Sequence, residues 1–505
     1  MRAALLALLL LVAPADAAPD IRPAPEFKVQ LAAAVFSTAF GFIQSRSIEV
    51  ATVEQIALWG LRAVTALDPG LEVERRDGIL HLNRGGSSSV HQRGAPASDA
   101  PGEWGAVAAD MTSAAWDASA NVRGAGTQGV ITAVFEEVFN FLDPYSRYVP
   151  PFIASSDRMR RSGDAGAGLE IMQAGGAFVV KTVNADGPGA EAGIVPGDRV
   201  LAVDGQPVRG VDLETLLELI AGVEGTDVTL TLRGRRGGTR IVTVERAVVP
   251  PETVFTQRYG DILLIRVTGF SADTDQRLSN ELERMLAPPA RVRGLVLDLR
   301  GNRGGLLRQA VAATDLVLAS GIVARTEGRN PRANNEFRAT AGDMAAGRPM
   351  IVLVDGQSAS AAEIMAAALA DGGRAVVVGS ATLGKGLVQT IATLPDGGEL
   401  FVSWSRILAP RGWPIQGLGV LPQVCTSLGS DSVSQQIASL NRGISRFAAV
   451  LARHRAARAP VSTAETVDLR AACPAADGRD SDLAAARTLL NNPTAYTAAL
   501  MSADP

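Results

Sequence analysis

The stretch SASAAEIMAAALADGGRAVVVGSATLGKGLVQT, residues 358–390, decides the fold class of this chain. It begins with an alanine-rich run without proline, which predicts a helix that ends at the Gly-Gly pair. The β-branched run RAVVVG then predicts a strand, and a glycine-rich loop that contains Lys385 follows it. The same alternation recurs upstream, where GLVLDLRGNRGG and PMIVLVDG each predict a strand before a helix. Repeated alternation of this kind predicts an α/β core, which we place at residues 249–426.

The regions on either side of this core differ from it in composition. A chain of 505 residues is expected to form two to four domains. Residues 18–154 predict a helical N-terminal region with a Gly/Ser/Pro-rich segment, residues 82–104, that we expect to be a mobile loop. Short β-branched runs punctuated by glycine in residues 155–248 predict a compact β-rich module. Residues 427–505 are alanine-rich and predict a helical C-terminal extension for packing or partner binding.

The sequence gives no support for a nucleic-acid partner or for a metal or organic cofactor. A net charge of -4 and a pI near 5.7 give no support for a nucleic-acid partner, and no dense basic run contradicts them. The sequence has no cluster of His, Cys and acidic residues at metal-ligand spacing. We therefore expect neither a metal nor an organic cofactor.

The N-terminus has the pattern of a secretory signal. Arg2 precedes an apolar run, and small residues follow at Ala15 and Ala17, so residues 1–17 predict a cleaved signal peptide. No later stretch is long enough to predict an integral membrane segment. Export to an oxidising compartment favours a disulfide between Cys425 and Cys473 over two free buried cysteines.

Lys385 is unusual because almost all of the positively charged residues in the chain are arginines. Lysine stands only at Lys28, Lys181 and Lys385. An amine can lose its proton, whereas a guanidinium cannot. GSATLGKG also fits most of a phosphate-loop pattern, but Gly386 stands where that pattern requires Ser or Thr. Lys385 could also be an ordinary solvated lysine in a loop.

A catalytic interpretation pairs Lys385 with Ser360, which lies at the predicted start of a helix. A serine hydroxyl needs a neighbouring base, and a triad with histidine has poor support because the three histidines lie far from this segment. Burial could lower the pKa of Lys385 enough for the amine to act as that base. Ser360 and Glu363 also fit a capping box, in which the serine only begins the helix. Ser358 could cap the helix instead, and the residues leave both alternatives open.

Acyl transfer also needs backbone N–H groups directed at the developing negative charge. The loop GNRGG follows a predicted strand, and its glycines allow close approach of the backbone. Gly305 and Ala361 are the candidate donors of this oxyanion hole. GNRGG could equally be a simple strand-to-helix turn.

Together these segments resemble one family, the carboxyl-terminal processing (tail-specific) serine peptidases. The resemblance rests on four stretches: LDPYSRYVPP, GLVLDLRGNRGG, residues 358–390 and SRILAPRGWPIQGLGVLPQV. It implies that Ser360 is the nucleophile, Lys385 the general base and Gln389 the residue that orients the base, with Gly305 and Ala361 as oxyanion-hole donors. It also implies a multidomain α/β protein whose core has the ClpP/crotonase-like fold.

By the same resemblance, the β-rich module looks like a PDZ domain inserted before the core. GPGAEAGIVPGDRVLAVDGQPV is typical of such domains, and GAGLE occupies the place of the carboxylate-binding loop. Ala167 is smaller than the apolar residue usual there. The expected peptide-binding residues are Gly166, Ala167, Gly168, Leu169 and Glu170.

The sequence therefore predicts an exported serine endopeptidase of the bacterial periplasm or cell envelope. It would bind the apolar C-terminus of a polypeptide and cleave nearby through an acyl-enzyme. The alternative is a PDZ scaffold protein of the same fold that binds peptides without cutting. An adaptor protein and a homo-oligomer are partners that the sequence neither requires nor excludes.

Overall fold

The computed structural model describes residues 26–502, apart from residues 86–87, 163–164, 185–186, 249, 290 and 341. The predicted signal peptide lies outside the described residues. Within them, no helix combines the length and the apolar character that crossing a membrane requires.

A six-stranded sheet in the order β13-β14-β15-β18-β19-β22 forms the centre of the predicted core. β13 pairs with β14 in antiparallel fashion, and all later pairs are parallel. The strands are β13 (Val254–Tyr259), β14 (Ile262–Val267), β15 (Gly294–Asp298), β18 (Met350–Val354), β19 (Val376–Gly379) and β22 (Val424–Cys425). This sheet confirms the α/β class that the strand–helix alternation predicted.

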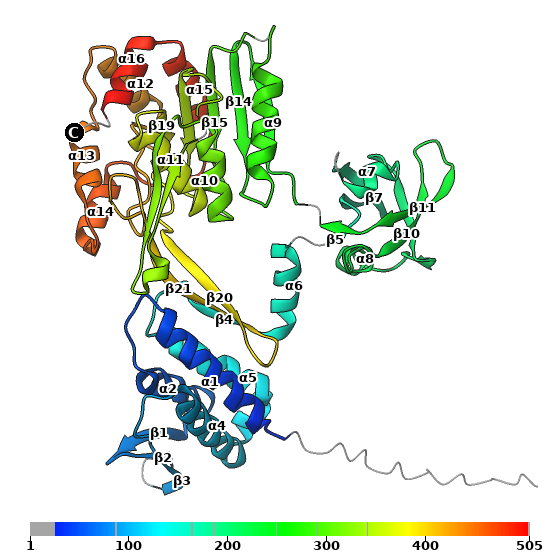
Figure 1. Ribbon diagram of the computed structural model, residues 1–505, viewed down its shortest axis with the longest axis vertical. Helices are drawn as coiled ribbons and strands as arrows, with labels where there is room; N and C mark the ends of the chain where they lie inside the picture. The colour runs from blue at the N-terminus through cyan, green and yellow to red at the C-terminus, as the bar shows by residue number, and fades with distance from the viewer. Residues whose placement is uncertain are drawn as a thin grey trace, which may run out of the picture.

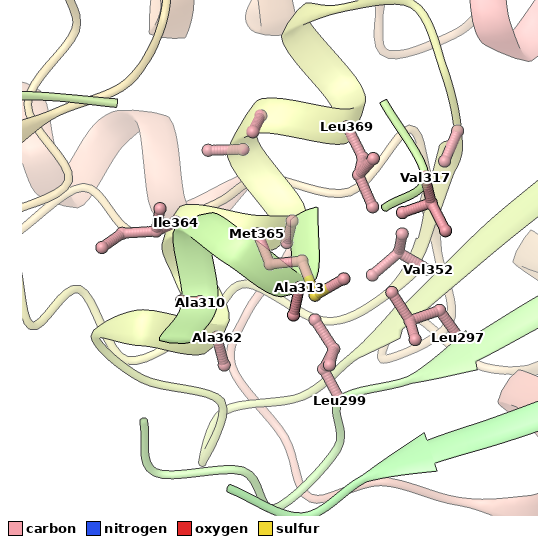
Figure 2. Packing of buried hydrophobic residues seen from close by; sticks show 14 of the residues in the cluster. Leu297, Leu299, Ala310, Ala313, Val317, Val352, Ala362, Ile364, Met365 and Leu369 are labelled. Carbon is pink, nitrogen blue, oxygen red and sulfur yellow. The ribbon is translucent and has the colours of Figure 1, made fainter. Parts of the chain in front are cut away.

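Helices cover both faces of the sheet. Because successive residues of a strand point to opposite sides, each strand contributes side chains to both layers. Leu297 and Val352 belong to one apolar cluster with residues of three core helices, and Figure 2 shows them near Ala313 and Met365 of two of these helices. Val296 and Ile351 belong to a cluster with the C-terminal helices. Burial on both faces explains why β15 and β18 are almost purely apolar. The three core helices are α9 (Thr274–Leu286), α10 (Leu307–Asp315) and α11 (Ala361–Asp371).

The C-terminal helices are a structural layer of the core and not an appendage to it. The last two, α15 (Asp480–Leu490) and α16 (Pro493–Met501), bury Leu489 and Tyr496 against the sheet (Figure 1). The Tyr496 hydroxyl accepts a hydrogen bond from the Met350 N–H at 3.0 Å. The other helices of this layer and its flank are α12 (Ser430–Leu440), α13 (Ala448–Ala456) and α14 (Thr463–Ala471).

A second, antiparallel sheet connects the core to the N-terminal region. Its strands run in the order β17-β16-β21-β20, and β4 (Arg147–Val149) pairs with β21. Leu400 and Val402 of β21 lie in the same apolar cluster as the N-terminal helices. The four strands are β16 (Gly321–Glu327), β17 (Asn335–Ala339), β20 (Leu387–Thr393) and β21 (Glu399–Leu408). Lys385 lies two residues before the start of β20, so this sheet brings the N-terminal region close to it.

The N-terminal region is helical, but our prediction of a mobile loop over residues 82–104 is wrong. Residues 71–76, 79–84 and 88–94 form a three-stranded antiparallel sheet, and α4 begins at Pro101. β3 is mostly exposed and polar, so it lacks the alternating apolar pattern that reveals a strand. The elements are α1 (Val29–Arg46), α2 (Val53–Leu61), α3 (Ala63–Leu67), β1 (Leu71–Arg76), β2 (Ile79–Arg84), β3 (Ser88–Gly94), α4 (Pro101–Ala118) and α5 (Ala120–Phe139).

The β-rich module follows α6 (Pro151–Ser162) and has its own core. Its main sheet runs in the order β11-β10-β8-β7-β6, and a short pair between β5 and β12 joins the start of the module to its end. Figure 1 shows the module to one side of the central sheet. Its elements are β5 (Ala165–Gly166), β6 (Leu169–Ala174), β7 (Ala177–Val183), α7 (Pro188–Glu191), β8 (Arg199–Val203), β9 (Gln206–Pro207), α8 (Leu213–Ile220), β10 (Asp227–Arg233), β11 (Thr239–Glu245) and β12 (Ala247–Val248).

Candidate active site

Three loops meet at the carboxyl-end edge of the parallel sheet, where α/β proteins place their ligands. GNRGG follows β15, the segment that ends at Ser360 follows β18, and the segment that contains Lys385 follows β19. Buried Asn302 joins two of these loops to β14. Its side chain donates to the Val267 carbonyl at 2.9 Å, and its own carbonyl accepts from the Ala359 N–H at 2.9 Å.

Ser360 lies directly before α11 in a conformation that an ordinary helix cap does not adopt. Its φ is 55° and its ψ is -114°, whereas capping residues usually have extended backbone. A positive φ is uncommon in residues other than glycine, and such conformations cluster at functional sites. The Ser358 hydroxyl is engaged elsewhere, because it accepts from the Asp355 N–H at 3.0 Å and donates to the Leu299 carbonyl at 2.8 Å. Glu363 also accepts a hydrogen bond from the Ser360 N–H, as the capping box predicts, so Ser360 begins α11 in an uncommon backbone conformation and its role as nucleophile stays a prediction.

The Glu363 carboxylate, which is fully buried, binds the loops of both Ser360 and Lys385. One oxygen accepts from the Ser360 N–H at 2.7 Å and from the Lys385 N–H at 2.9 Å. The other accepts from the Gly384 N–H at 2.7 Å and from the Thr382 hydroxyl at 2.5 Å. Burial raises the pKa of Glu363, and these donors oppose the rise because they favour the carboxylate form. One side chain thus fixes the two loops against each other.

Lys385 is half-buried, and its ammonium nitrogen lies 5.5 Å from the centre of the Tyr145 ring. Burial lowers the pKa of Lys385, and the positive charge of Arg147 lowers it further. Val388 packs against the apolar core, but Leu383 is 51% exposed and closes less of the pocket than expected. Because β20 and not a helix follows Lys385, the loop lacks the helix N-terminus that a phosphate loop needs.

Glycine flanks Lys385 because a second loop approaches its backbone closely. A Cβ at Gly386 would lie 2.2 Å from the Gln416 nitrogen, and one at Gly384 would lie 2.9 Å from the Gly417 carbonyl oxygen. Both distances are too short for a side chain. The flanking glycines therefore let residues 415–420 lie directly against the lysine loop.

Gln389 hydrogen-bonds to the segment before β4. Its amide nitrogen donates to the Tyr145 carbonyl at 2.5 Å, and its oxygen accepts from the Arg147 guanidinium at 3.5 Å. Its role in orienting Lys385 remains a prediction. Sequence reasoning did not identify Tyr145 and Arg147 as neighbours of Lys385. The available signal was LDPYSRYVPP, which contains both residues.

One candidate oxyanion donor, Ala361, follows Ser360 directly, and the other, Gly305, follows a glycine that lies against Ser360. A Cβ at Gly304 would lie 2.9 Å from the Ser360 Cβ and 3.1 Å from the Ala361 nitrogen, so the glycine loop touches the start of α11. Gly305 forms a parallel bridge to Phe270, in which the flanking residues make the hydrogen bonds. Within the described part of the chain, the N–H groups of Gly305 and Ala361 donate to no protein acceptor.

The expected peptide-binding loop of the β-rich module lines a cavity of about 720 Å³. Gly166, Ala167, Gly168, Leu169 and Glu170 form one wall, and Leu217 and Ile220 of α8 face them. Ala167 is buried, and Glu170 forms an ion pair with Lys181 at 2.7 Å. Pro250, Glu252 and Phe255, which lie just before or within β13, also line this cavity, so it is shared between the module and the core.

Cys425 and Cys473 form a disulfide in the structure, with their Cα atoms 5.8 Å apart. It joins the end of β22 to the segment that follows α14. The disulfide therefore fixes the C-terminal helices to the edge of the central sheet.

Comparison with known proteins places these features in a family. Residues 261–426 match the family model for peptidase family S41, and residues 179–234 match that for the PDZ domain. A carboxy-terminal-processing protease of Bartonella bacilliformis is 35% identical over 288 residues, which cover 56% of this chain and 66% of that protein. The carboxy-terminal processing protease CtpA of Bacillus subtilis is 32% identical over 289 residues, which cover 57% and 61%.

The matched segments span less than two thirds of either relative. Among solved structures, a photosystem II D1 C-terminal processing protease is 28% identical and covers 59% of this chain and 87% of its own, with a TM-score of 0.35. The family expected from the sequence is confirmed, and a PDZ domain implies binding of peptides. Residues 261–426 of this chain thus match peptidase family S41 and residues 179–234 match the PDZ domain, and the chain is similar to carboxy-terminal processing proteases.

Proposed function

We propose that the chain is a serine endopeptidase that binds polypeptide C-termini in its PDZ domain and cleaves nearby with Ser360 and Lys385. The observation that carries the proposal is the shared Glu363 carboxylate, which binds the backbone N–H groups of both residues. The lowered pKa of Lys385 supports its role as a base, since only about one lysine in 2500 is neutral at pH 7 when its pKa is the ordinary one.

The reaction begins when the neutral Lys385 amine takes the proton of the Ser360 hydroxyl. The serine oxygen attacks the scissile carbonyl, and the N–H groups of Gly305 and Ala361 stabilise the resulting oxyanion. The lysine then gives its proton to the leaving amine, which departs and leaves an acyl-enzyme. Water attacks the acyl group, Lys385 accepts a proton from the water, and the proton returns to the Ser360 oxygen.

The proposed substrates are polypeptides with accessible apolar C-termini, because apolar Leu217 and Ile220 line the PDZ cavity. We propose that the protein is exported to the periplasm or cell envelope of a bacterium. The signal pattern of residues 1–17 and the disulfide support this compartment. An adaptor protein and self-association stay predictions of the sequence.

The test compares the mature native chain with the Ser360→Ala and Lys385→Arg variants on an unfolded polypeptide that ends in apolar residues. Mass spectrometry identifies the products. Cleavage by the native chain alone is expected, because arginine keeps the charge of lysine but cannot accept a proton. If both variants cut like the native chain, the Ser–Lys dyad is wrong. If the native chain binds the polypeptide without cutting it, the scaffold alternative replaces the peptidase.

A further inference from the structure

The C-terminal helices reach the lysine loop through residues 415–420, which we name the bracing loop. Four hydrogen bonds join the bracing loop to the lysine loop, residues 382–386. Gly417 N–H donates to the Gly384 carbonyl at 2.9 Å, and Gly386 N–H donates to the Gln416 side-chain oxygen at 2.9 Å. Thr382 N–H donates to the Val420 carbonyl at 3.2 Å, and the Thr382 hydroxyl accepts from the Val420 N–H at 2.7 Å. Two of these bonds involve Gly384 and Gly386, the residues on either side of Lys385.

Arg470 of α14 holds the other side of the bracing loop. Its guanidinium donates to the Leu418 carbonyl at 2.8 Å and to the Gly417 carbonyl at 3.5 Å. A Cβ at Gly419 would lie 2.8 Å from both the Arg470 guanidinium and the Thr382 hydroxyl. The bracing loop is thus held between Arg470 and the residue that donates to Glu363.

Charge connects Arg470 to the same centre. Burial lowers the pKa of Arg470, and the Glu363 carboxylate opposes this fall because it favours the charged guanidinium. Burying a carboxylate is costly even when it is hydrogen-bonded, and a cation offsets part of that cost. These contacts identify the charged or titratable groups around Lys385, which are Glu363 on α11, Tyr145 and Arg147 at or just before β4, Arg470 on α14 and His454 on α13. The His454 ring nitrogen lies 3.0 Å from the Gly419 carbonyl oxygen.

We propose that Arg470 is a positioning residue for Lys385: it clamps the bracing loop and balances the charge of Glu363, so that the lysine loop stays closed around the amine. The inference rests on the proposed function and extends it to the C-terminal helices, which the peptidase and PDZ matches do not include. Without the clamp, water reaches the amine, and the uncompensated Glu363 charge favours its protonated form.

The test measures kcat, KM and the pH dependence of kcat for Arg470→Gln and Arg470→Lys. Arg453→Gln is the matched control, because Arg453 lies on the neighbouring helix α13 with a side chain 61% exposed. We expect Arg470→Gln to lower kcat at neutral pH about tenfold or more, to leave KM within about twofold, and to move the ascending limb to higher pH. Lysine should restore part of the loss, since its ammonium keeps the charge and can still donate hydrogen bonds, although without the planar fork of the guanidinium. Equal kcat and an unmoved limb in Arg470→Gln, or equal losses in both variants, would overturn the proposal.

A second measurement does not depend on cleavage. Lysine occurs at only three positions, so ¹³C labelling of the lysine Cε atoms gives three signals. The signal that is missing in Lys385→Arg belongs to Lys385. We expect the Lys385 signal to titrate at higher pH in Arg470→Gln than in the native chain and in Arg453→Gln. An unchanged titration would overturn the role of Arg470 even if the chain cleaves nothing. Absence of cleavage with a shifted titration would contradict only the proposed function.

Discussion

At the scale of single residues, the acceptor at position 363 must be a carboxylate. Four donors converge on its two oxygens, and three of them are backbone N–H groups that cannot become acceptors. A carboxamide offers one oxygen and an NH₂ group, so at least one of these backbone N–H groups would face another donor. A buried donor left without a partner costs about 1–3 kcal/mol.

Glu363→Gln is therefore expected to separate the loops of Ser360 and Lys385. We expect kcat to fall by more than tenfold and the melting temperature to fall as well. The control is Glu283→Gln, a substitution of an exposed residue on α9. Steady-state kinetics and thermal unfolding followed by circular dichroism measure the two effects. Native-like kcat in Glu363→Gln would show that the shared carboxylate is not needed to align the two loops.

The pKa of Lys385 determines the pH dependence of the reaction. The base must be neutral, and its pKa is lowered by burial and by Arg147, so kcat rises with pH along a limb that lies below the ordinary lysine range near 10.4. Arg147→Met removes a positive charge that disfavours the protonated amine. We expect the limb to move to higher pH and kcat at neutral pH to fall. The pH–rate profile measures both, with exposed Arg338→Met as control, and an unmoved limb would contradict the electrostatic role of Arg147.

At the scale of elements, the strands and helices of the core could be predicted because their periodicity and glycine boundaries are local. β15, β18 and β19 are short apolar runs, and each is followed by a loop with glycine. β3 could not be predicted, because an exposed strand lacks apolar alternation. The contact between Glu363 and Lys385 was also missed, since it depends on how two loops meet in the fold and not on either sequence alone.

The disulfide acts at the same scale, because it fixes the end of α14 to the end of β22. Its cysteines are 48 residues apart, and closing a loop of that length in the unfolded chain stabilises the fold by about 4 kcal/mol in the chain-entropy model. We expect the double variant Cys425→Ser/Cys473→Ser to lose stability of this order in urea unfolding. Native protein treated with a reductant should behave like the variant. An unchanged unfolding midpoint in both would mean that the cross-link constrains nothing.

At the scale of the whole molecule, the PDZ domain is an insertion whose two ends meet. β5 and β12 pair at Gly166 with Ala247 and at Ala165 with Val248, so residues 165–248 leave and re-enter the chain at one place. The domain also has its own apolar core. It should therefore fold alone, and a short flexible linker should replace it without unfolding the remainder.

The cavity lining makes a sharper prediction about recognition. Because Pro250, Glu252 and Phe255 lie outside the insertion but line its cavity, residues 165–248 alone should bind an apolar peptide more weakly than the whole chain does. Isothermal titration calorimetry with Ser360→Ala measures the whole-chain affinity without cleavage, and a C-terminally amidated peptide is the control for carboxylate recognition. In the chain with the linker, KM for a long polypeptide should rise while kcat on a short peptide persists. If the linker variant is folded but cleaves neither the polypeptide nor the short peptide, the PDZ domain is part of the active site. If the isolated domain and the whole chain bind the peptide with equal affinity, the core does not contribute to peptide binding.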